Sequence, residues 1–391
     1  MQHKHTFAAM LIVGLAACGL CVSSAFAGPY SGPSADEGNA YDPGIAGFVG
    51  PDGAGVVSAN NYVNPVFVGW ADGYRDYLPT SGVDIGWRNA ANAVGPVTGE
   101  KFHVVSLGDL TASQIAANVA PGQITLTFSR PICNGAGADL AAFENGFVVV
   151  PGYTFVELAY VEVSSNGVDF ARFPCQSLTQ RPEDDDWGYE SFDSTDIFGL
   201  AGKHANAYGN SWGTPFDLEA LRVDPLVAAG QLNLNLIQYV RLVDVVGSGD
   251  FLDSQDQPIY DTWETWGSGG FDVEAVGALH MLMPGDTDGS GVVNVLDLAA
   301  LAGNYDKVGT WRSGDFNGDG VINVLDLASL ASNYGKPSVA AGAAAIPEPA
   351  SLSLLAVAAL GLLRRRTVAG SIANELMGAV ARLFRPRRRF L

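Results

Sequence analysis

The chain has 391 residues, with 41 acidic against 21 basic side chains, which gives a formal charge of −20 at pH 7. This length allows about two ordinary domains. A hydrophobic content of 48% supplies enough apolar surface for a sandwich-sized core, which excludes wholesale disorder, and the 48 glycines follow no three-residue period, which excludes collagen. Because so acidic a chain would repel phosphate, we expect no nucleic-acid partner.

Residues 1–27 have the pattern of a secretory signal peptide. Lys4 precedes an apolar run over residues 7–22, and the segment ends with the small-residue string Ala25-Phe26-Ala27. We therefore expect an exported protein that is cleaved after residue 27. The alternative is a lipoprotein signal in which Cys18 is lipidated, but the apolar run continues past that cysteine to a better cleavage site.

The pattern of residues 28–283 predicts a β-sandwich, because short apolar or alternating runs in this region are separated by Gly, Pro, Asn and Asp. Only residues 110–119 and 217–223 have a helical period, which disfavours an α/β enzyme core. The expected strands cover residues 63–68, 123–128, 140–143, 146–150, 157–164, 170–173, 237–246 and 270–280.

Several strings in this region resemble the jelly-roll domains of bacterial surface proteins and, more distantly, galactose-binding-like sandwiches. They include Asn64–Ala71, Val161–Phe170 and Gly270–Val276. The resemblance implies an antiparallel jelly roll. It leaves the function open, because such sandwiches serve in binding, in adhesion and occasionally in catalysis.

Two cysteines, Cys133 and Cys175, remain after signal cleavage. In an exported chain two thiols can close one loop of about 40 residues, a link that chain-entropy arguments rate at a few kcal/mol. We expect a disulfide between them. The alternative is two separately buried thiols.

Four tryptophans in Gly- or Asp-rich, loop-like stretches are candidate ligand contacts: Trp187, Trp212, Trp263 and Trp266. Aromatic faces beside carboxylates suit the CH surfaces and hydroxyl groups of carbohydrates, so a polysaccharide is one expected partner. For each tryptophan the alternative is packing in the core.

A run of carboxylates between two expected strands predicts a third calcium site, beyond the two described below, since a cation would relieve their repulsion. The residues are Asp250, Asp253, Asp256 and Asp261, followed by Asp272 and Glu274. The alternative is a solvated acidic loop.

The string Gly209–Gly213 fits GxSxG, with Ser211 as the would-be nucleophile and His280 as the one downstream histidine. Asp244 or Asp272 would complete a triad. A nucleophile elbow needs a strand before the serine and a helix after it, and neither is expected here, so we predict a non-catalytic protein. The alternative is a secreted hydrolase acting on a polysaccharide or an ester.

One internal repeat is clear: GDTDGSGVVNVLDLAALAGNY at residues 285–305 recurs 29 residues later as GDFNGDGVINVLDLASLASNY at residues 314–334. Oxygen donors fall at positions 1, 3, 5, 9 and 12 of each loop, glycine at 6 and an apolar residue at 7, which is the calcium-loop pattern. The expected Ca²⁺ ligands are Asp286, Asp288, Ser290, the carbonyl of Val292, Asn294 and Asp297 in the first loop, and Asp315, Asn317, Asp319, the carbonyl of Val321, Asn323 and Asp326 in the second.

Each loop runs into an apolar helix, and no helix is expected before it. The apolar positions are Leu296, Leu298, Leu301 and Tyr305 in the first helix and Leu325, Leu327, Leu330 and Tyr334 in the second. One such unit cannot bury its own apolar face, so the two units should pack together, with calcium as part of their fold.

Such duplicated half-EF-hands, here residues 284–336, resemble the type I dockerin, which implies docking onto a cohesin-like surface protein. Many dockerins carry small hydroxyl residues at loop positions 10 and 11. This chain has Val295–Leu296 and Val324–Leu325 there. We therefore expect either an apolar-faced partner or packing of these pairs on the main domain.

The C-terminal region has the parts of a sorting signal. A linker over residues 337–349 ends in Pro347-Glu348-Pro349, and residues 350–366 form an apolar stretch followed by three arginines. This order resembles the PEP-CTERM signal of bacterial exosortase substrates, which implies transient anchoring by a single hydrophobic helix and transfer to the cell surface or matrix. The apolar stretch is short for an independent span, which needs about 20 residues. The basic tail, residues 367–391, is either an amphipathic helix on anionic lipid or a discarded segment.

Overall fold

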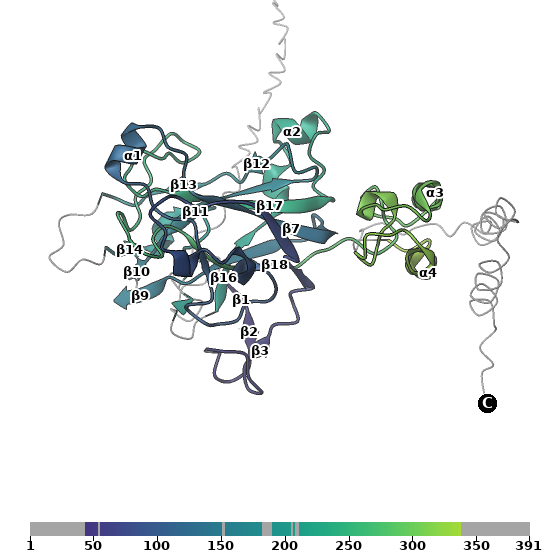
Figure 1. Ribbon diagram of the computed structural model, residues 1–391, viewed down its shortest axis with the longest axis horizontal. Coiled ribbons are helices and arrows are strands. Elements are labelled where there is room, and N and C mark those ends of the chain that lie inside the picture. The colour runs from purple at the N-terminus through teal and green to yellow at the C-terminus, as the bar shows by residue number, and fades with distance from the viewer. Residues whose placement is uncertain are drawn as a thin grey trace, which may run out of the picture.

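The computed structural model describes residues 44–337, except residue 54 and residues 151–152, 182–189, 205 and 208–210 (Figure 1). The expected signal peptide, the Pro-Glu-Pro motif, the hydrophobic C-terminal helix, the basic tail and Trp187 lie outside the described residues. None of the helices within the described ranges has the length and apolar character that crossing a membrane requires.

Two antiparallel sheets form the body of the molecule. The first contains β1 (Ile45–Ala46), β16 (Trp212–Phe216), β8 (Leu140–Glu144), β18 (Asp272–Ala278) and β4 (Gly69–Trp70) in this order, and β6 (Val105–Ser106) also pairs with β18. The second contains β12 (Ala171–Arg172), β11 (Leu158–Ser164), β17 (Ile237–Val245), β7 (Gln123–Ile132) and β5 (Gly73–Leu78).

The main core lies between these sheets. Leu126, Val161 and Leu242 from the second sheet are buried in one cluster with Val273 and Val276 from the first. Alternation along the strands of the second sheet directs its side chains inward, as expected for strands with one face on a core. In β18 a register shift between Val273 and Ala275 brings Val273 and Val276 to the same face. The predicted mainly β, antiparallel fold is therefore confirmed, and its two packed sheets are consistent with a sandwich.

Smaller elements surround the two sheets. They are the three-stranded sheet β14 (Phe192–Asp193), β10 (Tyr153–Phe155) and β9 (Phe147–Val150), the pairs β13 (Gln176–Ser177) with β15 (Ile197–Phe198) and β2 (Phe48–Val49) with β3 (Tyr62–Val63), the helices α1 (Ala112–Ala116) and α2 (Pro225–Ala228), and 3₁₀ helices at Ile85–Trp87, Ala90–Ala93, Ser194–Asp196 and Leu218–Leu221.

The strand expected over residues 63–68 is wrong for most of its length. Asn64 begins a turn: its Oδ1 accepts from the Val66 N–H at 3.1 Å, and its carbonyl accepts from the Phe67 N–H at 3.1 Å. Pro65 has no N–H for a ladder, so the apolar run is interrupted where a strand would need continuous pairing.

The two repeats form one small unit at one end of the molecule (Figure 1). Its helices α3 (Val295–Asn304) and α4 (Val324–Asn333) contact each other, as expected. The predicted absence of a helix before the loops needs one correction, a single 3₁₀ turn at Trp311–Ser313 ahead of the second loop. The unit shares one buried cluster with Cys133 and Leu236 of the β domain, so the two parts pack against each other.

Candidate functional site

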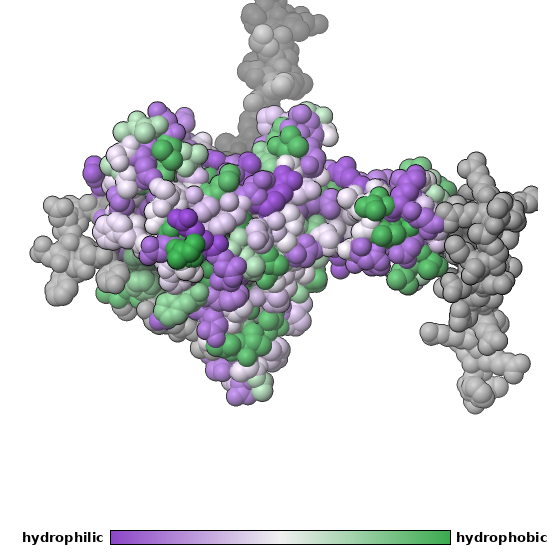
Figure 2. Space-filling view, in the orientation of Figure 1, coloured by the Kyte–Doolittle hydropathy of each residue, from purple (hydrophilic) through white to green (hydrophobic). Residues whose placement is uncertain are grey.

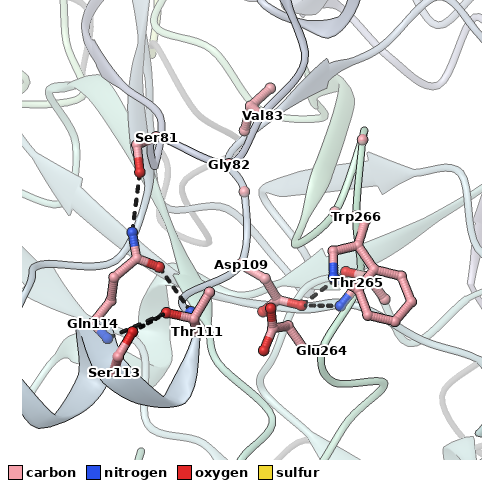
Figure 3. Close-up of a pocket in the computed structure, with 13 residues that line it drawn as sticks. Ser81, Gly82, Val83, Asp109, Thr111, Ser113, Gln114, Glu264, Thr265 and Trp266 are labelled. Carbon is pink, nitrogen blue, oxygen red and sulfur yellow. Dashed lines mark hydrogen bonds between the residues drawn. The ribbon is translucent and has the colours of Figure 1, made fainter.

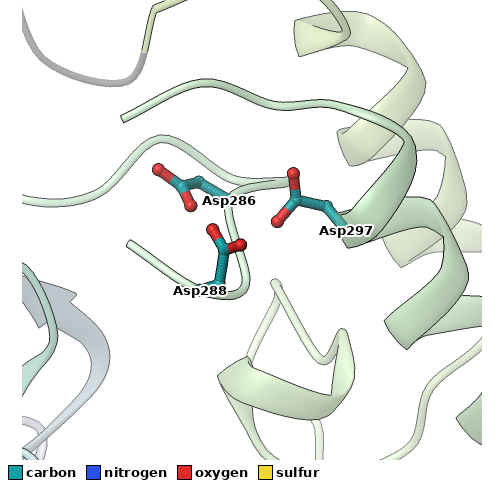
Figure 4. A group of neighbouring side chains, drawn as sticks. All are labelled: Asp286, Asp288 and Asp297. Carbon is teal, nitrogen blue, oxygen red and sulfur yellow. The ribbon is translucent and has the colours of Figure 1, made fainter. Parts of the chain in front are cut away.

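Three carboxylates of the first repeat loop converge on one point (Figure 4). One oxygen of each of Asp286, Asp288 and Asp297 lies within 4.8 Å of the others. Asp286 and Asp297 are buried, whereas Asp288 is exposed, so the group opens to solvent on one side. Of the described residues, this is the group of acidic, histidine or cysteine side chains placed closely enough to share a metal ion.

The backbone of this loop curls around Asp286. Its Oδ1 accepts from the N–H groups of Gly289 at 2.8 Å and Ser290 at 3.1 Å, and its Oδ2 accepts from Gly291 at 2.9 Å. Gly289 and Gly291 have φ of 68° and 83°, a conformation that side-chain-bearing residues rarely adopt. The glycines of the repeat are therefore needed for the curl itself.

The other expected ligands gather at the same loop. The Val292 carbonyl accepts from Ser290 Oγ at 3.2 Å and from Asn294 Nδ2 at 3.1 Å. Asn294 and Asp297 also form a capping box at the start of α3, in which Asp297 Oδ2 accepts from the Asn294 N–H at 2.8 Å. Capping of α3 thus accounts for the positions of the Asn294 and Asp297 side chains. It does not account for the position of the Asp288 carboxylate beside them.

The donor set fits a hard cation. Every side chain expected to bind is an oxygen donor, which Ca²⁺ prefers and which softer metals do not require. Burial, together with the smaller effects of the nearby Asp297 and Asp288, raises the pKa of Asp286 to about 6. A divalent ion would offset the mutual repulsion of these carboxylates.

The second loop repeats this bonding. Asp315 accepts from the N–H groups of Gly318 and Gly320, each at 2.9 Å, and Asp326 accepts from Phe316 at 2.8 Å and from Asn323 at 2.9 Å. It carries an amide, Asn317, where the first loop has a carboxylate, and Asn317 Nδ2 donates to Asp319 Oδ2 at 2.9 Å. Because Asp319 stands where the first loop has Ser290, each loop still carries three donor carboxylates, at different positions of the same frame.

Two side chains tie the repeats together. The buried Trp311 donates from Nε1 to the carbonyl of Asp286 at 2.6 Å, and Asn333 Nδ2 donates to the Pro284 carbonyl at 2.7 Å. The first loop is also held by the β domain, since Asn233 and Asn235 donate to the carbonyls of Asp288 and Gly289 at 3.3 and 3.2 Å. Its geometry thus depends on three parts of the fold.

The first turn of each repeat helix exposes an apolar pair. Leu296 is 65% exposed and Leu325 is 60% exposed, whereas Leu298, Leu301 and Leu330 are buried in the cluster that joins the two repeats. The reason is position: each leucine is the second residue of its helix, two residues after the capping asparagine, and lies off the face that contacts the other repeat. Packing of these pairs on the main domain is therefore not observed, and Figure 2 shows apolar surface on the repeat unit.

A second feature is a cleft in the β domain, with a volume of about 350 Å³ (Figure 3). Its walls come from residues 81–83, 108–114 and 264–269. Trp266 lines it and is 81% exposed. Asp109 lies between Trp266 and Gln114 in the view of Figure 3, and its Oδ2 accepts from Thr265 N and Oγ1, both at 2.8 Å. Burial raises the pKa of Asp109 to about 7.

The other candidate tryptophans have different surroundings. Trp263 is half-buried, and its Nε1 donates to the Leu110 carbonyl at 2.9 Å, which anchors the loop behind the cleft. Trp212 is half-buried in β16, and its N–H donates to Asn206 Oδ1. Of the candidate tryptophans within the described residues, Trp266 is the one that lines this cleft.

The acidic run expected to hold a third calcium does not converge. Asp253 caps a turn, accepting from Gln255 and Gln257 at 2.8 and 2.9 Å, while Asp250 and Asp256 are exposed. Asp261, Asp272 and Glu274 are buried at separate places, where they accept from Leu158, Asn145 and the N–H groups of Thr98 and Gly99, respectively.

The conceivable serine triad is not assembled. His280 Nδ1 lies 2.7 Å from Asp139 Oδ1, and Asp244 Oδ1 accepts from the Phe271 N–H at 2.7 Å. Ser211 is buried and is followed by strand β16 rather than by a helix, so it does not stand on a nucleophile elbow.

The predicted disulfide is wrong in this structure. Cys133 and Cys175 are both free and buried. Cys133 belongs to the cluster shared with the repeats, whereas Cys175 lies in a separate cluster beneath β13 and β15. The fold places each thiol in its own apolar environment, which raises the pKa of both.

Comparison with known proteins gives no relative: no protein-family model matches the chain, and no curated protein matches it.

Proposed function

We propose that this is an exported, non-catalytic surface protein in which a calcium-bound repeat pair joins a β-sandwich binding domain to a larger assembly. The observation that carries the proposal is the convergence of Asp286, Asp288 and Asp297 in a loop whose hydrogen bonding is repeated around Asp315. A hydrogen-bonding frame that recurs in both loops, with three carboxylates converging in the first, favours metal loops over solvated turns.

Calcium would be held by the six donors named for each loop. When bound, the ion supplies positive charge that fixes the acidic donors of the loop around one centre. The chain does the rest: Trp311 and Asn333 hold the repeats together, and Asn233 and Asn235 hold the first loop against the β domain. An occupied loop would in this way set the orientation of α3 and α4.

The partner we propose is a cohesin-like surface protein with an apolar contact face. Support comes from the resemblance to dockerins and from the exposure of the same Val-Leu pair in both copies. Because both copies present the pair, the unit could dock in two orientations related by its internal duplication. The jelly-roll topology, signal cleavage and exosortase sorting at Pro347–Pro349 complete the proposal, and they rest on the sequence patterns.

The experiment is a calcium titration of the chain by calorimetry, followed by chelator-sensitive capture of its partner from cell-surface extracts. We expect two bound ions per chain, one fewer after Asp286→Asn or Asp315→Asn, and two after the control substitution Asp250→Asn at an exposed carboxylate. Captured cohesin-like protein should be released by chelator and lost when Leu296 and Leu325 are both replaced by aspartate. Absence of calcium uptake would refute the proposal, as would capture that is indifferent to chelator.

A further inference from the structure

The cleft of Figure 3 has the size and rigidity of a small-ligand site. Its volume of about 350 Å³ falls at the lower end of the range for such sites, which starts at about 300 Å³. Its two walls are connected by backbone: Val83 and Gly267 form a parallel bridge, and the Asp84 N–H donates to the Gly267 carbonyl at 2.9 Å. The cleft is therefore preformed rather than assembled from loose loops.

One wall is aromatic. Trp266 is 81% exposed, so a large apolar ring stands in water at the mouth of the cleft. The adjacent Gly267 is fixed by the bridge to Val83, which holds the ring in place without burying it. An apolar ligand face that covers the indole would remove this surface from water.

The opposite wall is polar and uncharged. Gln114 belongs to the capping box of α1, where its Oε1 accepts from the Thr111 N–H at 2.8 Å, and its Nε2 donates to Ser81 Oγ at 3.1 Å. These bonds fix the amide and leave the Ser81 hydroxyl at the cleft surface. Hydroxyl and amide groups of this kind both donate and accept hydrogen bonds.

Carboxylates line the cleft between the two walls. Asp109 is held by Thr265 through one oxygen, and Glu264 lies beside it (Figure 3). None of the described residues that line the cleft is basic. An anionic ligand would be repelled, whereas carboxylates readily accept hydrogen bonds from ligand hydroxyl groups.

We propose that this cleft binds a neutral saccharide, with the CH face of one sugar ring stacked on Trp266 and its hydroxyl groups bonded to Asp109, Glu264 and the Ser81–Gln114 wall. The inference rests on the proposed binding role of the β domain and names its ligand class. A cationic amine would satisfy Trp266 and the carboxylates, but it would leave the uncharged wall without a partner. A saccharide uses all three parts of the cleft.

The test is a binding screen of the full chain against neutral glucose, galactose and mannose oligosaccharides, with spermidine as the cationic probe. Binding is followed by saturation-transfer NMR and titration calorimetry. We expect at least one oligosaccharide to bind, with affinity reduced about tenfold or more by Trp266→Ala and by Asp109→Asn. The control Tyr62→Ala removes an exposed aromatic ring on β3, far from α1 in Figure 1, and should leave affinity unchanged.

Three results would overturn the inference. They are no binding of any saccharide in the panel, equal saccharide affinity of the wild type and Trp266→Ala, or binding of spermidine to this cleft without binding of any saccharide. Melting curves of the variants check folding, which the exposed position of Trp266 should leave intact. Calcium uptake is measured on the same samples. If the wild type binds two calcium ions but no saccharide, only the saccharide proposal is refuted. If it binds a saccharide but takes up no calcium, only the proposed assembly role is refuted.

Discussion

Replacing Glu274 by glutamine should change how the stability of the β domain depends on pH. Glu274 is buried on β18, where its Oε1 accepts from the N–H groups of Thr98 at 3.2 Å and Gly99 at 2.9 Å. Burial raises its pKa from 4.5 to about 7. The folded chain therefore binds this proton more tightly than the unfolded chain does.

The sign and size of the effect follow from proton linkage. A carboxyl with a raised pKa in the folded state contributes fully at low pH, and its contribution is lost as pH rises from the unfolded pKa through the folded one. For Glu274 the total is about 3 kcal/mol, most of which is lost between about pH 5 and about pH 8. The glutamine variant keeps an oxygen to accept the two N–H bonds and has no proton to lose.

The assay is urea unfolding at a series of pH values with calcium present, followed by tryptophan fluorescence. The free energy of unfolding of the wild type should fall by about 2–3 kcal/mol more than that of Glu274→Gln over this range. Because the other titrating groups are the same in both chains, their contributions to the pH dependence cancel in the comparison. Glu100→Gln, at an exposed glutamate near the same segment, should behave as the wild type does. Parallel pH profiles for wild type and Glu274→Gln would refute the reasoning.

Further outcomes follow for the repeats and the thiols. Replacing either Leu296 or Leu325 alone by aspartate should leave partner capture intact, because the other copy can still dock. The double variant should lose capture, and its circular dichroism spectrum should be unchanged. Loss of capture in either single variant would contradict two-way docking. Trp311→Ala should destabilise the repeat unit by about 3–5 kcal/mol in urea unfolding, since it empties a buried site and removes a hydrogen bond. Cys133 and Cys175 should both be alkylated after unfolding without reductant, and a reducing agent should not shift the melting temperature; a mass two hydrogens lower would show a disulfide.

The repeat loops were open to prediction from the sequence because their geometry is local. Donors and glycines at fixed spacing within one turn of chain produce the same bonds at Asp286 and at Asp315. Burial of the helices was less predictable. Leu296 fits an apolar period but lies in the first turn of its helix, two residues after the capping asparagine, and only the packing of the two repeats decides which face is covered.

The cleft could not be predicted as a site, because its walls come from three segments far apart in the chain. The sequence signalled Trp266 through its loop-like context, but nothing in the spacing joins it to Asp109 or Gln114. The disulfide prediction was wrong for the same reason. The cysteine count and the expected export favour a disulfide, but its formation depends on the tertiary positions of the two thiols, and Cys133 and Cys175 lie in different clusters.

The central claim is that two loops of this chain enclose calcium, and native mass spectrometry of the purified chain tests it most directly. The account predicts two calcium ions per chain at low micromolar free calcium, their removal by chelator, and a loss of helical circular dichroism when they leave. A chain that retains no calcium and keeps the same helicity after chelation would contradict it.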